Sequence, residues 1–171
     1  MTGEPTGQVA DRLDELVMSV AELLGVECVG LLMRDDVDRL RMVSSSGPAA
    51  AGLEHAQEIT GVGPGPDAQL TGVPVAVTDV LAVAPYADLA PRVRGGGVRA
   101  VLSVPVLVGQ EVVGNLNAVD PDPHPWSDRQ HIDMQSFAAL IADLLVLSAA
   151  GRGQDVPTLA GHLADVDGAP A

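Results

Sequence analysis

Two strongly apolar runs, 99–108 and 111–119, are separated by only two residues, Gly109 and Gln110. A two-residue link between β-rich runs is typical of a tight hairpin turn, so the runs are predicted to pair as antiparallel strands. Both runs are apolar nearly throughout, and we therefore expect the hairpin to lie inside a sheet that is covered on both faces. These expectations favour an α+β fold with an antiparallel sheet.

Helical periodicity marks the two ends of this region. Apolar residues recur every three or four positions in 8–24, which predicts a helix that ends before Gly25. Ser127 followed by Gln130 is the pattern of a capping box and predicts a second helix that runs to about Ala149. The segments between are predicted as strands at 27–34 and 39–46, a short strand at 57–60, a short helix at 66–70, a strand at 73–79 and a short helix at 85–94.

The length of 171 residues and the apolar content of 47% indicate one globular domain. We predict that it covers residues 8–149, with the terminal helices on one face of the sheet and the short helices over the other. Residues 1–7 are polar, and 150–171 contain glycine, proline and aspartate without a strong period. We therefore expect a disordered N-terminus and a flexible acidic tail.

The charged residues exclude several functions. The chain has no lysine, and nine arginines stand against 23 acidic residues, which gives a net charge of -14. Without lysine, Schiff-base chemistry, a pyridoxal-phosphate anchor and a P-loop are excluded. An acidic chain with one Phe, one Trp and one Tyr also argues against nucleic acid as a partner.

The single cysteine, Cys28, excludes an internal disulfide and a cysteine-cluster metal site. The N-terminus lacks the features of a secretory signal, and the longest apolar run, 137–147, contains Asp143 and is too short to cross a bilayer. We therefore expect a cytoplasmic protein with no membrane partner. The polar groups at 35–38 and 120–128 are interpreted as a turn and a solvated loop, so no catalytic and no metal-binding residue is predicted.

A series of short motifs follows the order of a known family. The segments 63–68 (GPGPDA), 72–75 (GVPV) and 77–79 (VTD) precede 97–106 (GVRAVLSVPV), 113–117 (VGNLN) and the pair Trp126-Ser127. In this order they resemble a GAF domain over residues 8–148, most like stand-alone or ANTAR-associated GAF domains of actinobacterial regulators. The resemblance implies a PAS-related fold and a non-enzymatic sensory or regulatory module in signal transduction.

The resemblance also implies a small, largely apolar pocket between the sheet and the middle helices. Arg92, Arg94 and Arg99 form a local concentration of positive charge, so Arg92 or Arg99 is expected to contact an anionic group unless it pairs with an acid such as Asp79. The cofactor is unknown, and the partner is a small molecule or a signalling protein. The predicted ligand-binding residues are Leu70, Val77, Asp79, Tyr86, Arg92, Arg99, Val101, Ser103 and Asn117.

Two alternatives stay open. The first is a ligand-free interaction protein that forms a homodimer through its terminal helices, as GAF domains often do; a pocket filled by side chains would favour it over the sensor. The second is an enzyme similar to the free methionine sulfoxide reductases, which rely on several cysteines. This alternative is disfavoured, because Cys28 is the one cysteine and Gly65 stands where related regulators often place another.

Overall fold

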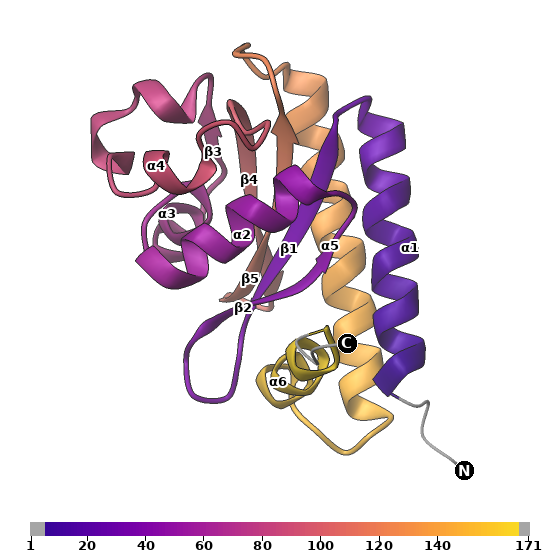
Figure 1. Cartoon of the computed structure of the whole chain (residues 1–171). Coiled ribbons are helices and arrows are strands. Elements are labelled where there is room, and N and C mark those ends of the chain that lie inside the picture. The colour runs from indigo at the N-terminus through magenta and orange to yellow at the C-terminus, as the bar shows by residue number, and fades with distance from the viewer. Residues whose placement is uncertain (1–5, 168–171) are drawn as a thin grey trace.

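The computed structural model describes residues 6–167 and contains one antiparallel sheet (Figure 1). The strands follow the spatial order β2-β1-β5-β4-β3, so the hairpin of β4 and β5 lies inside the sheet as predicted. Gly109 adopts a positive φ of 64° in the turn that joins them. The strands are β1 (Cys28–Arg34), β2 (Leu40–Ser45), β3 (Val75–Val77), β4 (Ala100–Val108) and β5 (Glu111–Asp120).

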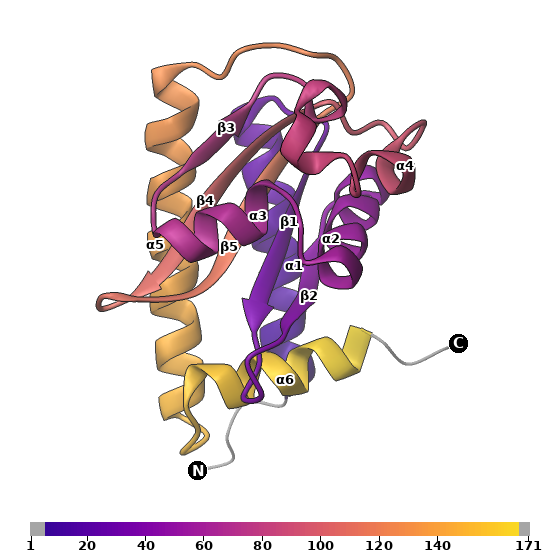
Figure 2. The same cartoon turned by 90° about the vertical axis from the view of Figure 1, so that its left-hand side faces the viewer.

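Helices cover both faces of the sheet, and the predicted division of the elements is confirmed (Figures 1 and 2). The long helices α1 (Thr6–Leu24) and α5 (Asp128–Ala150) lie side by side on one face. The opposite face carries α2 (Pro48–Thr60), α3 (Pro64–Thr71), α4 (Ala90–Val93) and the 3-10 turns η1 (Val80–Ala82) and η2 (Ala84–Tyr86).

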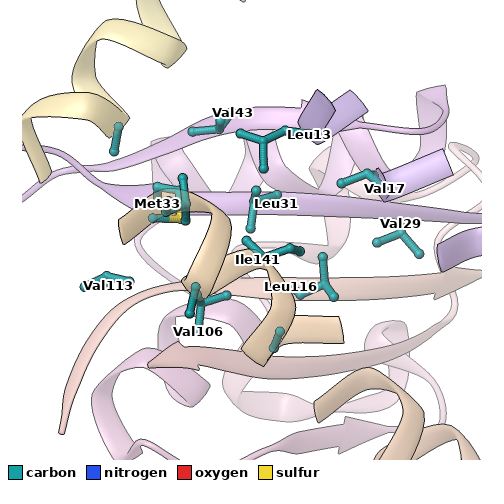
Figure 3. Close-up of a cluster of buried hydrophobic side chains, with 14 of the residues drawn as sticks. Leu13, Val17, Val29, Leu31, Met33, Val43, Val106, Val113, Leu116 and Ile141 are labelled. Carbon is teal, nitrogen blue, oxygen red and sulfur yellow. The ribbon is translucent and has the colours of Figure 1, made fainter. Parts of the chain in front are cut away.

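The larger of two apolar clusters lies between the sheet and the long helices (Figure 3). Alternate residues of β1 point into it, because successive side chains of a strand face opposite sides. Leu13 of α1 and Ile141 of α5 pack in the same cluster as this row. The residues that Figure 3 labels from the strands are Val29, Leu31, Met33, Val43, Val106, Val113 and Leu116.

The start of α5 has the predicted capping box. The backbone N–H of Gln130 donates to Ser127 Oγ at 3.2 Å, and the Gln130 side chain accepts from the Ser127 N–H at 3.0 Å. Each bond satisfies a polar group that a helix end leaves without a partner inside the helix.

The strand predicted at 57–60 is wrong. These residues form the last turn of α2, which begins with Pro48 in its first turn and ends at Gly61 in the left-handed conformation. Proline at the start and glycine after the end are ordinary boundaries of a helix. The Gly- and Ala-rich composition of this segment concealed the helical period.

The prediction of a flexible tail is also wrong for most of 150–171. Residues Val156–Asp167 form α6, which packs across one end of α1, α5 and the edge strand β2 (Figure 2). Leu159 and Leu163 are buried in the larger cluster, and Arg41 of β2 pairs with Asp165 at 3.0 Å. Thr6 and Gly7 belong to α1, whereas the predictions for residues 1–5 and 168–171 lie outside the described residues.

Replacing Leu159 tests whether α6 is part of the folded unit. Leu159→Ala should lower the free energy of unfolding by about 2–5 kcal/mol, because it leaves a cavity in a buried cluster. Val166→Ala is the control on the same helix, since Val166 is exposed, and should change the stability by less than about 0.5 kcal/mol. Urea denaturation measures both. Equal effects of the two substitutions would contradict the packing of α6.

Candidate functional site

A group of polar side chains is buried between the sheet and the helices α2 and α3. We call these residues the polar cluster, and each has none of its surface exposed to solvent. Amide side chains are mostly exposed, and carboxylates are almost never buried so completely unless they are paired. The cluster consists of Glu54 and Gln57 of α2, Ser103 of β4, and Asn115 and Asn117 of β5.

The register of the sheet brings the strand members of the cluster together. Asn117 lies opposite Ser103 of β4 on one side and opposite Gly30 of β1 on the other. Asn115 is two residues away on the same strand, so it shares the face of Asn117. Three central strands therefore present polar or very small residues at one spot beneath α2.

Helical spacing brings Glu54 and Gln57 onto the sheet. They lie on the face of α2 that also carries the buried residues Ala50 and Leu53, in the pattern i, i+3, i+4, i+7. Gly30 makes the room for the carboxyl group, because a Cβ atom at this position would lie 2.3 Å from Glu54 Oε1.

Gly65, at the start of α3, has the same function for Asn115. A Cβ atom at Gly65 would lie 2.6 Å from Asn115 Nδ2 and 3.0 Å from the amide of Gln57. The glycine in the GPGPDA segment therefore allows α3 to approach the polar cluster closely.

Two amides hold the carboxyl group of Glu54. Asn117 Nδ2 donates to both of its oxygens at 2.7 and 2.9 Å, and Gln57 Nε2 donates to Oε2 at 2.9 Å. Gln57 Oε1 in turn accepts the backbone N–H of Gly65 at 2.8 Å. The network thus links α2, β5 and the start of α3.

Several buried atoms of the cluster have no hydrogen-bond partner within residues 6–167. They are Ser103 Oγ, Asn117 Oδ1 and both polar side-chain atoms of Asn115. A buried polar atom without a partner destabilises a protein by about 1–3 kcal/mol. Four such atoms at one place form a concentration that packing alone does not explain.

Burial raises the pKa of Glu54 to about 8, because the charged form loses its hydration. The hydrogen bonds from Asn117 and Gln57 oppose the shift, and the nearby charge of Glu58 adds to it. Within the described chain, no cationic side chain is among the groups that shift this pKa. Glu54 is therefore a proton-binding group near neutral pH.

Three predicted site residues gather in the smaller apolar cluster beside the polar one. Val77, Tyr86 and Val101 are buried there together. The Tyr86 hydroxyl donates to Asp67 Oδ2 of α3 at 2.6 Å, and burial followed by this bond raises the pKa of Tyr86. Of the other predicted residues, Ser103 and Asn117 belong to the polar cluster.

The structure does not bring Leu70 into this space. The Leu70 side chain is 87% exposed, because the inner face of α3 is formed by Pro64, Gly65 and Ala68. Its assignment to a pocket wall was wrong. The pocket space itself is filled by the side chains of the polar cluster.

The predicted basic residues do not form one anion-binding group either. Arg99 makes a two-point ion pair with Asp79, with distances of 2.9 and 2.6 Å. The pair lowers the pKa of Asp79 and raises that of Arg99. Arg92 and Arg94 are exposed at the end of α4, so the alternative of acid pairing holds for Arg99.

Cys28 is buried at the start of β1 and accepts the backbone N–H of Ala50 at 3.1 Å. Burial raises the pKa of its thiol, which disfavours the reactive thiolate.

The Asp35 carboxylate binds the backbone N–H groups of Val37 and Arg39 and closes the turn that the sequence predicted.

Sequence reasoning missed Glu54, Gln57 and Asn115. A helical reading of 48–60 would have placed Ala50, Leu53, Glu54 and Gln57 on one face and revealed a carboxylate on a buried stripe. For Asn115, the alternation with Asn117 was visible in the VGNLN segment.

Comparison with known proteins agrees with this architecture. The model of the family described as GAF domain matches residues 8–145, so the chain belongs to the GAF domain family. Its class is that of signalling and regulatory modules. No curated protein is significantly similar in sequence.

Solved structures share the fold at low sequence identity. A domain of a two-component sensor histidine kinase protein from Sinorhizobium meliloti 1021 is 15% identical, with a TM-score of 0.70, over 84% of this chain and 94% of that one. A type II free methionine-R-sulfoxide reductase from Thermoplasma acidophilum is 18% identical, with a TM-score of 0.67, over 84% and 96%. The GAF domain from Acinetobacter phosphoenolpyruvate-protein phosphotransferase is 17% identical, with a TM-score of 0.66, over 85% of each chain.

The raised pKa of Glu54 predicts a stability that falls with pH. Between its usual value of 4.5 and about 8, the native state holds a proton that the unfolded state has lost, so raising the pH favours unfolding. Glu54→Gln should remove a slope of up to about 1.4 kcal/mol per pH unit. Urea denaturation from pH 5 to 9 measures it. The exposed Glu22→Gln variant should keep the wild-type slope, and equal slopes in all three proteins would contradict the assignment.

Proposed function

We propose that this GAF domain is a cytoplasmic regulatory module in signal transduction that acts as a homodimer joined through α1 and α5. The observation that supports the proposal is the apolar surface that these helices leave uncovered. A kinship with actinobacterial and ANTAR-associated regulators is part of the same proposal and rests on the sequence resemblance.

The outer face of α5 is the main support for a dimer. Its inner face packs on the sheet, yet Ile132, Leu140, Val146 and Leu147 are exposed on other faces. By length and composition alone α5 could cross a membrane, a test that the core helix of a soluble protein also passes. Asp143 interrupts the exposed face, and this favours a protein partner over lipid.

Helix α1 extends this surface. Leu23 is 72% exposed and Met18 is 59% exposed, while Leu16 of α1 and Phe137 and Leu144 of α5 are only partly buried against the larger cluster. Half of the exposed large apolar residues described in residues 6–167 thus belong to these two helices. A second copy would cover them in a bundle of helices, a packing that suits such faces.

Charged residues on the outer face of α5 test the dimer. Leu140→Glu combined with Leu147→Glu should convert a dimer into a monomer, because two carboxylates per chain would be buried without partners. Leu70→Glu is the control, since Leu70 is exposed on the other side of the sheet. Light scattering at micromolar concentration measures the mass. A monomeric wild-type protein would refute the proposal.

The polar cluster supports a second function, the sensing of a small molecule. The filled pocket space favours the ligand-free alternative, but it is filled by polar groups, and four of their buried atoms have no partner among the described residues. Such atoms favour a bound group that supplies hydrogen bonds. This function requires that a small molecule stabilise the native state in a saturable manner.

We propose further that the module is not an enzyme of the sulfoxide reductase type, although two of the similar structures are described as such reductases. Cys28 is buried, and its pKa is raised. A thiol reagent should therefore modify Cys28 slowly in the native protein and rapidly in urea. Mass spectrometry measures both rates. Rapid modification of the native protein would favour a nucleophilic cysteine.

A further inference from the structure

The polar cluster offers mainly acceptors to a bound molecule. Its unpaired acceptors are the side-chain carbonyl oxygens of Asn115 and Asn117, and the carboxyl group of Glu54 lies between α2 and Asn117. Ser103 Oγ can accept or donate, and Asn115 Nδ2 is the one further unpaired donor of the cluster. A molecule that carries several N–H donors would complement these acceptors.

The charges around the cluster point the same way. Among the described residues, the charge of Glu58 of α2 raises the pKa of Glu54, and Glu54 in turn raises that of Cys28, a neutral thiol of β1. Arg39, just before β2, and Arg41, within it, both pair with acids. Arg41 contacts Glu58 at 3.9 Å and Asp165 at 3.0 Å, and Arg39 pairs with Asp35 at 3.0 Å. A buried anion would face a carboxyl group with no cation to balance it, whereas a cation would pair with that group.

The donors that now satisfy Glu54 occupy the position that a ligand would take. Gln57 Nε2 and Asn117 Nδ2 are neutral amides on rotatable side chains, and a charged N–H donor makes a stronger hydrogen bond to a carboxylate than a neutral amide does. A cationic ligand would therefore displace the Gln57 amide from the Glu54 carboxylate and form a stronger hydrogen bond in its place.

Gln57 separates the rest of the polar cluster from a groove on the surface. A groove of about 480 Å³ lies between β2 and the end of α2, and Gln57 forms part of its wall together with Leu40, Arg41 and Glu58. Figure 2 shows α2 and α3 on the same face of the sheet, with α2 mainly over β1 and β2 and α3 over β3, β4 and β5. Gln57 thus lies between this groove and Glu54.

From these observations we infer that the polar cluster binds a small organic cation, which it recognises through an ammonium, amidinium or guanidinium group held by Glu54, Ser103, Asn115 and Asn117. The inference rests on the small-molecule function proposed above and assigns its ligand class. Binding requires the deprotonated carboxylate, so the ligand competes with a proton on Glu54.

Calorimetry and thermal shift with matched probes test the ligand class. The probes are putrescine and butylamine, each compared with its fully N-acetylated, uncharged form, agmatine as a guanidinium, and succinate and 2-oxoglutarate as anions. At least one free amine should bind saturably and raise the melting temperature, while its acetylated form and the two anions should not. Because the amines stay protonated, the association constant should rise up to tenfold per unit from pH 6 to 8.

Three variants identify the site. Glu54→Gln should lower the association constant at least tenfold and abolish its pH dependence, and Ser103→Ala should lower it about tenfold with the pH dependence kept. Glu22→Gln should bind as the wild type does. Cooperative unfolding of each variant shows that it is folded.

The remaining outcomes distinguish a failure of the ligand class from a failure of the small-molecule function. An anion that binds better than every amine, and that Ser103→Ala weakens, would overturn the ligand class and keep the sensing site. The absence of binding by every probe at every pH would overturn the ligand class and the small-molecule function together. Neither result concerns the homodimer, which the molecular mass tests separately.

Discussion

The alternation of side chains along β5 is the constraint on which the rest of the structure depends. Leu116 and Ala118 point into the larger apolar cluster, while Asn117 points toward α2 and Asn115 toward the start of α3. Because β5 lies between β1 and β4, a shift of one residue would bury the amides beneath α5 and place the leucine beside Glu54. The register of one central strand therefore fixes both the apolar core and the polar cluster.

Small residues make this arrangement possible. Gly30 of β1 and Gly65 of α3 approach the polar side chains so closely that a methyl group at either position would collide with them. The sheet is thus hollowed at Gly30 to receive a carboxyl group from a helix, and α3 begins where Gln57 can bond to its backbone. Because of the two glycines and the amides, the helices α2 and α3 contact the sheet here through specific hydrogen bonds as well as apolar packing.

Much of the fold could be predicted from the sequence, because it depends on short-range patterns. The two-residue turn at Gly109, the capping box at Ser127 and the period of 8–24 are each patterns within one continuous short segment of the chain. Helix α6 was missed, because its burial depends on contacts with the distant strand β2 that no local period reveals.

The site was predicted only in part for the same reason. Ser103 and Asn117 belong to strands that were correctly placed. Glu54 and Gln57 lie on α2, of which only 57–60 was predicted as an element, and wrongly as a strand. Glutamate side chains are mostly exposed in folded proteins, so the average burial of this residue type does not predict that Glu54 is buried. Its position follows from a long-range match with Gly30 and Asn117, 24 and 63 positions away along the chain.

The polar cluster and the proposed dimer surface share the sheet as their only common support among the described elements. Asn117 contacts Glu54 on one face, and its neighbours Leu116 and Ala118 pack in the cluster beneath α1 and α5 on the other. A ligand that drew Asn117 away from Glu54 would act on the backbone of β5, and close packing on the far face transmits such a displacement rather than absorbing it. Coupling between the proposed ligand and the proposed dimer would therefore have a physical route through one strand, and its strength would depend on how differently the ligand binds the two arrangements of that strand.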